Sequence, residues 1–199
     1  MLRYARAAGI PVDSAIDTGL LRITDKEAAK DKRDAFTPDD IAALFWTSYL
    51  NADGDRGPLW WIAHLAAYTG ARREELAGLD CGDIERRDGI AGIVIHNNEH
   101  RGIKTGQSAR FIPFHPHLIE MGLVDYAAER RAGILFPLKR KSRLSTLGDS
   151  IDYRWRKAMR EAGIPADGKK TFHSFRYYAV QTLIDKEVTH SLYVHVLPK

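Results

Sequence analysis

Three groups of polar residues in this sequence could carry chemistry: Arg72 with Glu75, Lys104, and His173 with Arg176. In the first and last groups the two residues are three positions apart, so on a helix both side chains would project from one face and could serve one site. Arginine binds anions with a planar, permanently charged fork, whereas lysine and histidine can also transfer protons. Each group has a simpler interpretation too: a surface ion pair, a solvated loop lysine, and a capping or packed histidine.

The first group follows two predicted helices. FTPDDIAALF predicts a helix because Thr37 can cap it, Pro38 suits its first position, and the two aspartates favour the positive end of the helix. LWWIAHLAAY (59–68) is apolar nearly all round, which is typical of a helix buried inside a domain. After a break at residues 69–70, ARREELAGL (71–79) predicts a further helical turn or two.

The second group lies between two predicted strands. Residues 92–96 and 110–114 predict a β-hairpin whose long polar tip, HRGIKTGQSA, carries Lys104. Further helices are predicted over residues 115–131, 147–162 and about 172–186. The expected fold class is therefore α+β: a mainly helical domain with a small antiparallel β-hairpin or sheet.

Charge is distributed unevenly along the chain of 199 residues. The net charge is +4, but residues 101–199 contain 18 Lys and Arg against 9 Asp and Glu. Such an excess points to a polyanionic partner, because Lys and Arg release counterions from a phosphate backbone.

The single Cys81 excludes an internal disulfide framework and a multi-cysteine zinc site. No apolar run approaches the roughly 20 residues of a membrane span, so a cytoplasmic protein that does not enter a membrane is the default expectation.

Several motifs occur in the order found in one enzyme family. TGARREEL (69–76), KTGQSARFIPFHPHL (104–118) and FHSFR (172–176) resemble the first arginine box, the catalytic hairpin and the His-x-x-Arg box of tyrosine recombinases of the phage-integrase type. FTPDDI and LFP (135–137) are also similar to that family. The resemblance covers roughly residues 36–190 and implies the catalytic domain of an enzyme that performs site-specific recombination or integration of double-stranded DNA.

The resemblance also implies a role for each candidate residue. Arg72 and Arg176 would hold the non-bridging oxygens of the scissile phosphate, whose negative charge grows in the transition state. Lys104 would protonate the leaving 5′ oxygen, His173 would support the transition state, and Glu75 would orient Arg72. No metal or cofactor is implied, because these cations supply the positive charge.

The family completes its site with a Gly-His segment and a tyrosine that forms a covalent 3′-phosphotyrosyl intermediate. The spacing beyond Arg176 places the Gly-His near the last two residues, so we expect the chain to lack both features. Tyr193 is an alternative nucleophile, although it lies early and no Gly-His precedes it. Tyr177 and Tyr178 are expected to pack.

The expected domain organisation follows from the same comparison. Residues 1–35 would be a linker and the remnant of an N-terminal DNA-binding domain, and residues 36–199 would be a catalytic domain without its C-terminal end. We expect a monomer in solution, whereas family members form tetramers on DNA. Whether the chain is itself an enzyme stays open. The alternatives are a non-catalytic DNA-binding remnant of the same fold, and a helical protein-binding domain in which the motif matches are chance.

Other basic residues have simpler interpretations. His96 with His100, and His115 with His117, lack the helical spacing of a zinc motif and are not expected to bind metal. The run KRKSR (139–143) is either a solvated loop or a contact to the DNA backbone.

Overall fold

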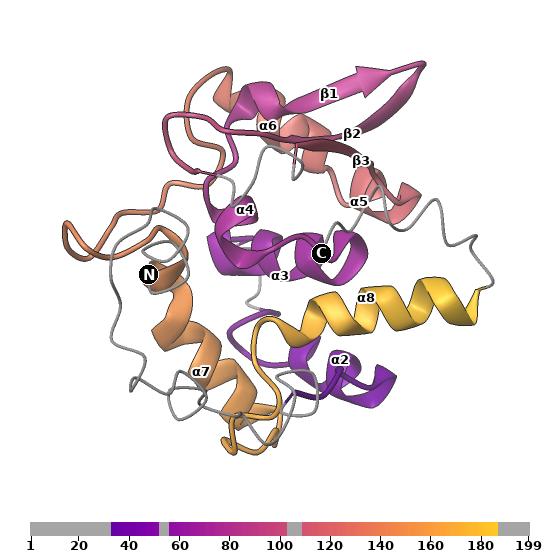
Figure 1. Cartoon of the computed structure of the whole chain (residues 1–199), viewed down its shortest axis with the longest axis vertical. Helices are drawn as coiled ribbons and strands as arrows, with labels where there is room; N and C mark the ends of the chain where they lie inside the picture. Colours follow the sequence, from indigo (N-terminus) through magenta and orange to yellow (C-terminus); the bar gives the residue numbers. More distant parts are fainter. Residues whose placement is uncertain (1–32, 52–55, 103–108, 187–199) are drawn as a thin grey trace, which may run out of the picture. The chain divides into compact units, whose positions relative to one another are not determined.

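The computed structural model describes residues 33–51, 56–102 and 109–186 (Figure 1). The chain divides into two units between Lys32 and Arg33, and the described residues all belong to the second. Lys104 and Tyr193 lie outside the described residues.

The first three helices form in the segments where the sequence predicts helices, with bounds that differ by a few residues. Helix α2 (Pro38–Phe45) is capped by Thr37, whose hydroxyl accepts a hydrogen bond from the Asp40 backbone N–H at 3.1 Å. Helix α3 (Pro58–Thr69) has seven buried residues among its 12 and ends at Gly70, whose φ of 60° is left-handed and suits glycine. Helix α4 (Arg73–Ala77) follows after the three residues 70–72.

The sheet has three antiparallel strands rather than two. Strands β2 (Ile90–Ile95) and β3 (Arg110–Pro113) form the predicted hairpin, with Ile93 opposite Ile112. The unpredicted β1 (Ile84–Arg87) pairs with β2 through a turn at Asp88 and Gly89, which both have positive φ. Asp-Gly is a strong hairpin signal, so the sequence does contain the information for this strand.

The second half of the domain is helical. The segment predicted as one helix over residues 115–131 forms two, α5 (Pro116–Glu120) and α6 (Leu123–Arg130), because Gly122 between them has a φ of 85°. A short 3-10 turn (Gly148–Ile151) leads into α7 (Asp152–Glu161), and α8 (Ser174–Asp185) is the last described helix.

Helix α3 lies at the centre of the domain. It packs against α4 and α8, with the sheet beyond α4 on one side and with α2 and α7 on the side of α8 (Figure 1). Aromatic rings of Phe36, Trp155, Phe172 and Phe175 pack edge-on between the last two helices, with centroids 5.0 to 6.2 Å apart. The α+β prediction is therefore confirmed, and the packing holds the start of α8 near the start of α4. No helix within the described ranges is long and apolar enough to cross a membrane.

Candidate active site

Arg72 and Glu75 lie at the start of α4. Arg72 is not within the helix but caps it, with extended backbone (φ −70°, ψ 147°). The Glu75 carboxylate accepts a hydrogen bond from the Arg72 backbone N–H at 2.8 Å and from its guanidinium at 3.0 Å. The Glu75 side chain is 5% exposed and that of Arg72 26%, so Glu75 holds an arginine that solvent can still reach.

His173 and Arg176 lie at the start of α8. His173 occupies the capping position, and a local turn precedes the helix because Ser174 Oγ accepts the Thr171 N–H at 3.0 Å. Arg176 donates from Nη1 to the Gly70 carbonyl oxygen at 2.9 Å. This bond ties α8 to the turn directly before Arg72, so residues about 100 positions apart in the chain share one site.

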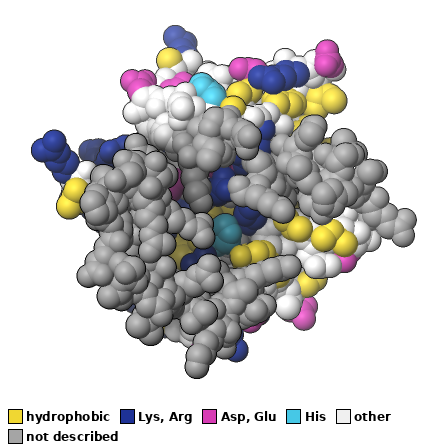
Figure 2. Space-filling view, in the orientation of Figure 1, with side chains coloured by type: hydrophobic (Ala, Val, Ile, Leu, Met, Phe, Trp, Pro, Cys, Tyr) yellow, Lys and Arg dark blue, Asp and Glu magenta, His cyan; other side chains and the backbone are white. Residues whose placement is uncertain are grey.

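A cavity of about 1290 Å³ opens between α4, α7 and α8. Arg72, His173 and Arg176 line one part of it, together with Glu75. Figure 2 shows Lys and Arg side chains beside a histidine in a hollow near the middle of this face. Three of the four predicted catalytic residues therefore converge. The fourth, Lys104, lies outside the described residues.

The convergence of cations changes the acidity of the groups in the cavity. Burial lowers the pKa of Arg176, and the neighbouring Arg72 and Arg110 lower it further, to about 10, so Arg176 is still a cation at neutral pH. Burial and then Arg176 hold the pKa of His173 below its ordinary 6.5, so His173 is neutral at pH 7 and can accept a hydrogen bond or a proton. The cavity thus combines permanent cations with a neutral imidazole.

Sequence reasoning missed Arg110, at the start of β3. Its guanidinium donates two hydrogen bonds to the Glu75 carboxylate, at 3.2 and 2.9 Å, and both side chains are at most 5% exposed. Burial alone would raise the pKa of Glu75, but the bonds and charges of Arg110 and Arg72 outweigh it and hold that pKa below the ordinary 4.5. Glu75 is therefore an ionised carboxylate shared by two arginines.

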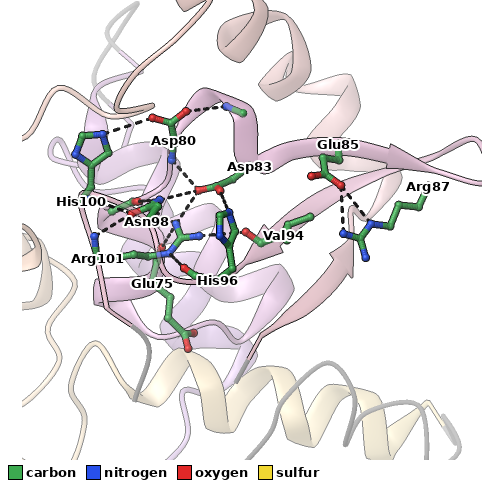
Figure 3. A network of polar contacts seen from close by, with 12 residues as sticks. Glu75, Asp80, Asp83, Glu85, Arg87, Val94, His96, Asn98, His100 and Arg101 are labelled. Atoms are coloured by element: carbon green, nitrogen blue, oxygen red, sulfur yellow. Dashed lines mark hydrogen bonds and ion pairs between the residues drawn. The ribbon is translucent and has the colours of Figure 1, made fainter. Parts of the chain in front are cut away.

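A second buried arginine, Arg101, was also missed (Figure 3). It forms an ion pair with Asp83 at 2.9 Å, with both side chains 2% exposed. Its guanidinium also donates to four backbone carbonyls, those of Glu75, Gly78, Val94 and His96, at 2.9 to 3.1 Å. Arg101 therefore fastens the C-terminal end of α4 to the sheet.

Two of the four histidines that were not expected to bind metal contact other side chains. His96 contacts the Asp83 carboxylate at 2.7 Å, and His117 contacts the Tyr68 hydroxyl at 2.5 Å. Among the described residues, one group could present three metal ligands: Asp80, Glu99 and His100, whose ligand atoms lie within 4.8 Å of one another. Two acidic side chains and one histidine at a partly exposed site are a common surface arrangement without an ion.

Two tyrosines follow Arg176. Tyr178 packs against the core, as predicted, and the Tyr177 ring lies edge-on to His173 with centroids 5.3 Å apart.

The basic run at residues 139–143 borders a smaller cavity of about 310 Å³. Arg140 and Arg143 line it together with Gly102, which also lines the larger cavity. The basic loop therefore adjoins the candidate site.

The comparisons with known proteins assign the chain to a family. The model of the Phage integrase family matches residues 36–193. The chain belongs to this family, whose members are tyrosine recombinases. No curated protein sequence matches this recombinase domain.

Solved recombinase structures have the same fold. A lambda integrase dimer bound to a COC′ core site is 18% identical with a TM-score of 0.64, over 100% of this chain and 67% of that one. A lambda integrase tetramer bound to a Holliday junction is 20% identical with a TM-score of 0.61, over 98% and 54%. The XerH recombinase bound to palindromic difH, in a post-cleavage complex, is 17% identical with a TM-score of 0.58, over 86% and 48%. The chain thus spans about half the length of the XerH recombinase.

Proposed function

We propose that this chain carries the phosphate-activating part of a recombinase that breaks and rejoins double-stranded DNA through a 3′-phosphotyrosyl intermediate. The observation that carries the proposal is the convergence of Arg72, His173 and Arg176 on one cavity, from the N-terminal ends of two helices that are distant in sequence. Membership of the phage integrase family supports the same reaction class.

Each residue then has a role in the reaction. Arg72 and Arg176 bind the non-bridging oxygens and stabilise the charge that develops on them in the pentacoordinate transition state. Neutral His173 donates a hydrogen bond to the same phosphate or accepts the proton of the attacking hydroxyl, and Lys104 protonates the 5′ oxygen as it leaves. Loss of one such donor typically reduces the rate about 10²–10³-fold.

The proposal extends to the partners and to the organisation of the chain. Residues 1–35 would be a linker and the remnant of an N-terminal DNA-binding domain, and duplex DNA would be the ligand. Lambda integrase occurs as a dimer and a tetramer on DNA, so we propose assembly on DNA from a protein that is monomeric in solution.

The first experiment tests strand cleavage. The purified chain is incubated with nicked duplexes that trap cleavage, and denaturing electrophoresis detects protein attached covalently to DNA. An adduct that Arg176→Ala abolishes supports the proposal. Its loss in Tyr193→Phe would identify Tyr193 as the nucleophile.

The second experiment tests phosphate activation without a protein nucleophile. The substrate is a nicked duplex with a 3′-p-nitrophenyl phosphate ester facing a free 5′-hydroxyl. Attack of the 5′ oxygen on phosphorus breaks the bond to the aryl oxygen and releases p-nitrophenolate, while the hydroxyl proton passes to a base on the protein or to water. We expect joined DNA and an equal amount of p-nitrophenolate, and we expect Arg72→Ala and Arg176→Ala each to slow both about 10²–10³-fold without abolishing them.

The two experiments together separate the alternatives. Joining without an adduct means that the described site activates phosphate but this chain supplies no nucleophile. Salt-dependent DNA binding with neither joining nor an adduct would contradict the proposal and favour a DNA-binding role without catalysis.

A further inference from the structure

The Glu75 carboxylate has four hydrogen-bond donors around it. Its two oxygens accept the backbone N–H and the guanidinium of Arg72, and both accept bonds from Arg110. A carboxylate has about four acceptor positions, so these donors saturate it. Glu75 therefore has no acceptor position left for a hydrogen bond from a substrate. It can affect the site only through Arg72.

Of the two arginines, Arg110 is more deeply buried and is held by the more extensive secondary structure. Its side chain is 4% exposed and that of Arg72 is 26% exposed. Arg110 also belongs to β3, which pairs with β2 in a register of four residue pairs, whereas Arg72 precedes the short helix α4. The ion pair thus connects the sheet to a more exposed arginine through one buried carboxylate.

We propose that Arg110 is a positioning residue of the recombinase site, which acts on the scissile phosphate through Glu75 and Arg72. The inference rests on the proposed function, in which Arg72 binds the phosphate. Arg110 holds the carboxylate with two parallel bonds and neutralises it. The carboxylate then sets the orientation of the Arg72 guanidinium toward the cavity.

The geometry requires arginine rather than lysine at position 110. A planar fork donates two parallel hydrogen bonds to a carboxylate, whereas a lysine ammonium supplies the same charge without that constraint. Arg110→Lys thus preserves the buried ion pair and the fold but loosens Glu75. Arg110→Met removes the charge as well, and its folding is the less secure of the two.

The first test observes Arg72 directly and needs no catalysis. The Nε–H signal of Arg72 is assigned in ¹⁵N spectra by its loss in Arg72→Ala. We expect Arg110→Lys to shift this signal and to increase its mobility, whereas Arg86→Lys, at an exposed position of β1, leaves it unchanged. An Arg72 signal in Arg110→Lys that coincides with the wild-type signal would overturn the proposal.

The second test uses the joining reaction of the nicked p-nitrophenyl ester. Residues that orient metal-binding side chains typically contribute about 10–100-fold, and by analogy we expect a loss of that size in the joining rate of Arg110→Lys, with DNA affinity nearly unchanged. In an Arg72→Ala background the same substitution should cost less than about threefold, because its effect passes through Arg72.

The outcomes separate this inference from the proposed function. An equal loss in both backgrounds would show that Arg110 acts independently of Arg72, and the inference would be wrong. If the wild type joins no strands, the proposed function fails, and the Arg72 signal alone decides the role of Arg110.

Discussion

Replacement of Arg101 by methionine should destabilise the domain severely. The guanidinium is paired with Asp83 in a position where both side chains are 2% exposed, and it also donates to four carbonyl oxygens. Methionine has a similar apolar length but no donor. Asp83 would keep its bonds to His96 and to the Asp80 N–H but lose its buried cation.

The size of the effect follows from this arrangement. Removal of one partner from a buried ion pair typically costs about 3–5 kcal/mol, since the other charge stays buried. For a domain of this size each kcal/mol lowers the melting temperature by about 2–4 °C, so Arg101→Met should melt roughly 6–20 °C lower. Urea denaturation, monitored by circular dichroism, gives the free energy of unfolding.

Two comparisons make the experiment decisive. Arg87→Met removes an ion pair with Glu85 in which both side chains are at least 44% exposed (Figure 3), together with the cation–π contact to Phe111, and it should cost less than about 2 kcal/mol. Asp83→Asn combined with Arg101→Met should be less destabilised than the sum of the two single variants, because neither charge is then left alone. A loss below about 1 kcal/mol in Arg101→Met, or strict additivity, would refute the argument.

Three further predictions concern charge. Since burial and Arg176 lower the pKa of His173, NMR titration should give a value below 6.5 in the free protein and a higher one with bound DNA; an unchanged value would argue against phosphate binding beside it. The lowered pKa of Glu75 means that its ionised form stabilises the fold above the ordinary pKa of 4.5 and that this contribution is lost as pH falls through the folded value. Glu75→Gln should therefore lose stability relative to wild type at pH 7 and lose less below pH 4.5, and a pH-independent difference would contradict this. Arg140→Gln and Arg143→Gln should each reduce the salt dependence of DNA binding by about one phosphate contact, for any DNA sequence, as measured by fluorescence anisotropy over a salt series.

Local patterns in the sequence predicted most of the elements. The Thr37 capping box, the apolar run of α3 and the turn residues around the hairpin act over a few positions, so the sequence displays them directly. The boundaries were less accurate where one glycine decides them. Gly122 divides a predicted helix in two, and the Asp88-Gly89 turn adds a strand.

The residues of the candidate site also fall into those that the sequence predicted and those that it did not. Arg72, His173 and Arg176 were identified because motifs of known order surround them. Arg101 and Arg110 were not, because the sequence does not show that a charged residue is buried or which distant carboxylate it meets. Arg110 lies 35 positions from Glu75, and only the folded sheet brings the two together.

The arginines around the cavity explain why a buried carboxylate is needed beside a phosphate site. Arg72 and Arg110 lie close enough to Arg176 for their charges to lower its pKa, and mutual repulsion of this kind opposes folding. Glu75 offsets part of it from a buried position. A bound phosphate would offset more of it by supplying negative charge in the cavity itself. A ligand that binds only the folded state shifts the folding equilibrium, so DNA should stabilise the domain. Because the bound phosphate also offsets the repulsion between the arginines, this stabilisation should exceed what the same number of surface contacts would give. The excess should disappear in Arg176→Ala, and its persistence there would place the DNA elsewhere on the domain.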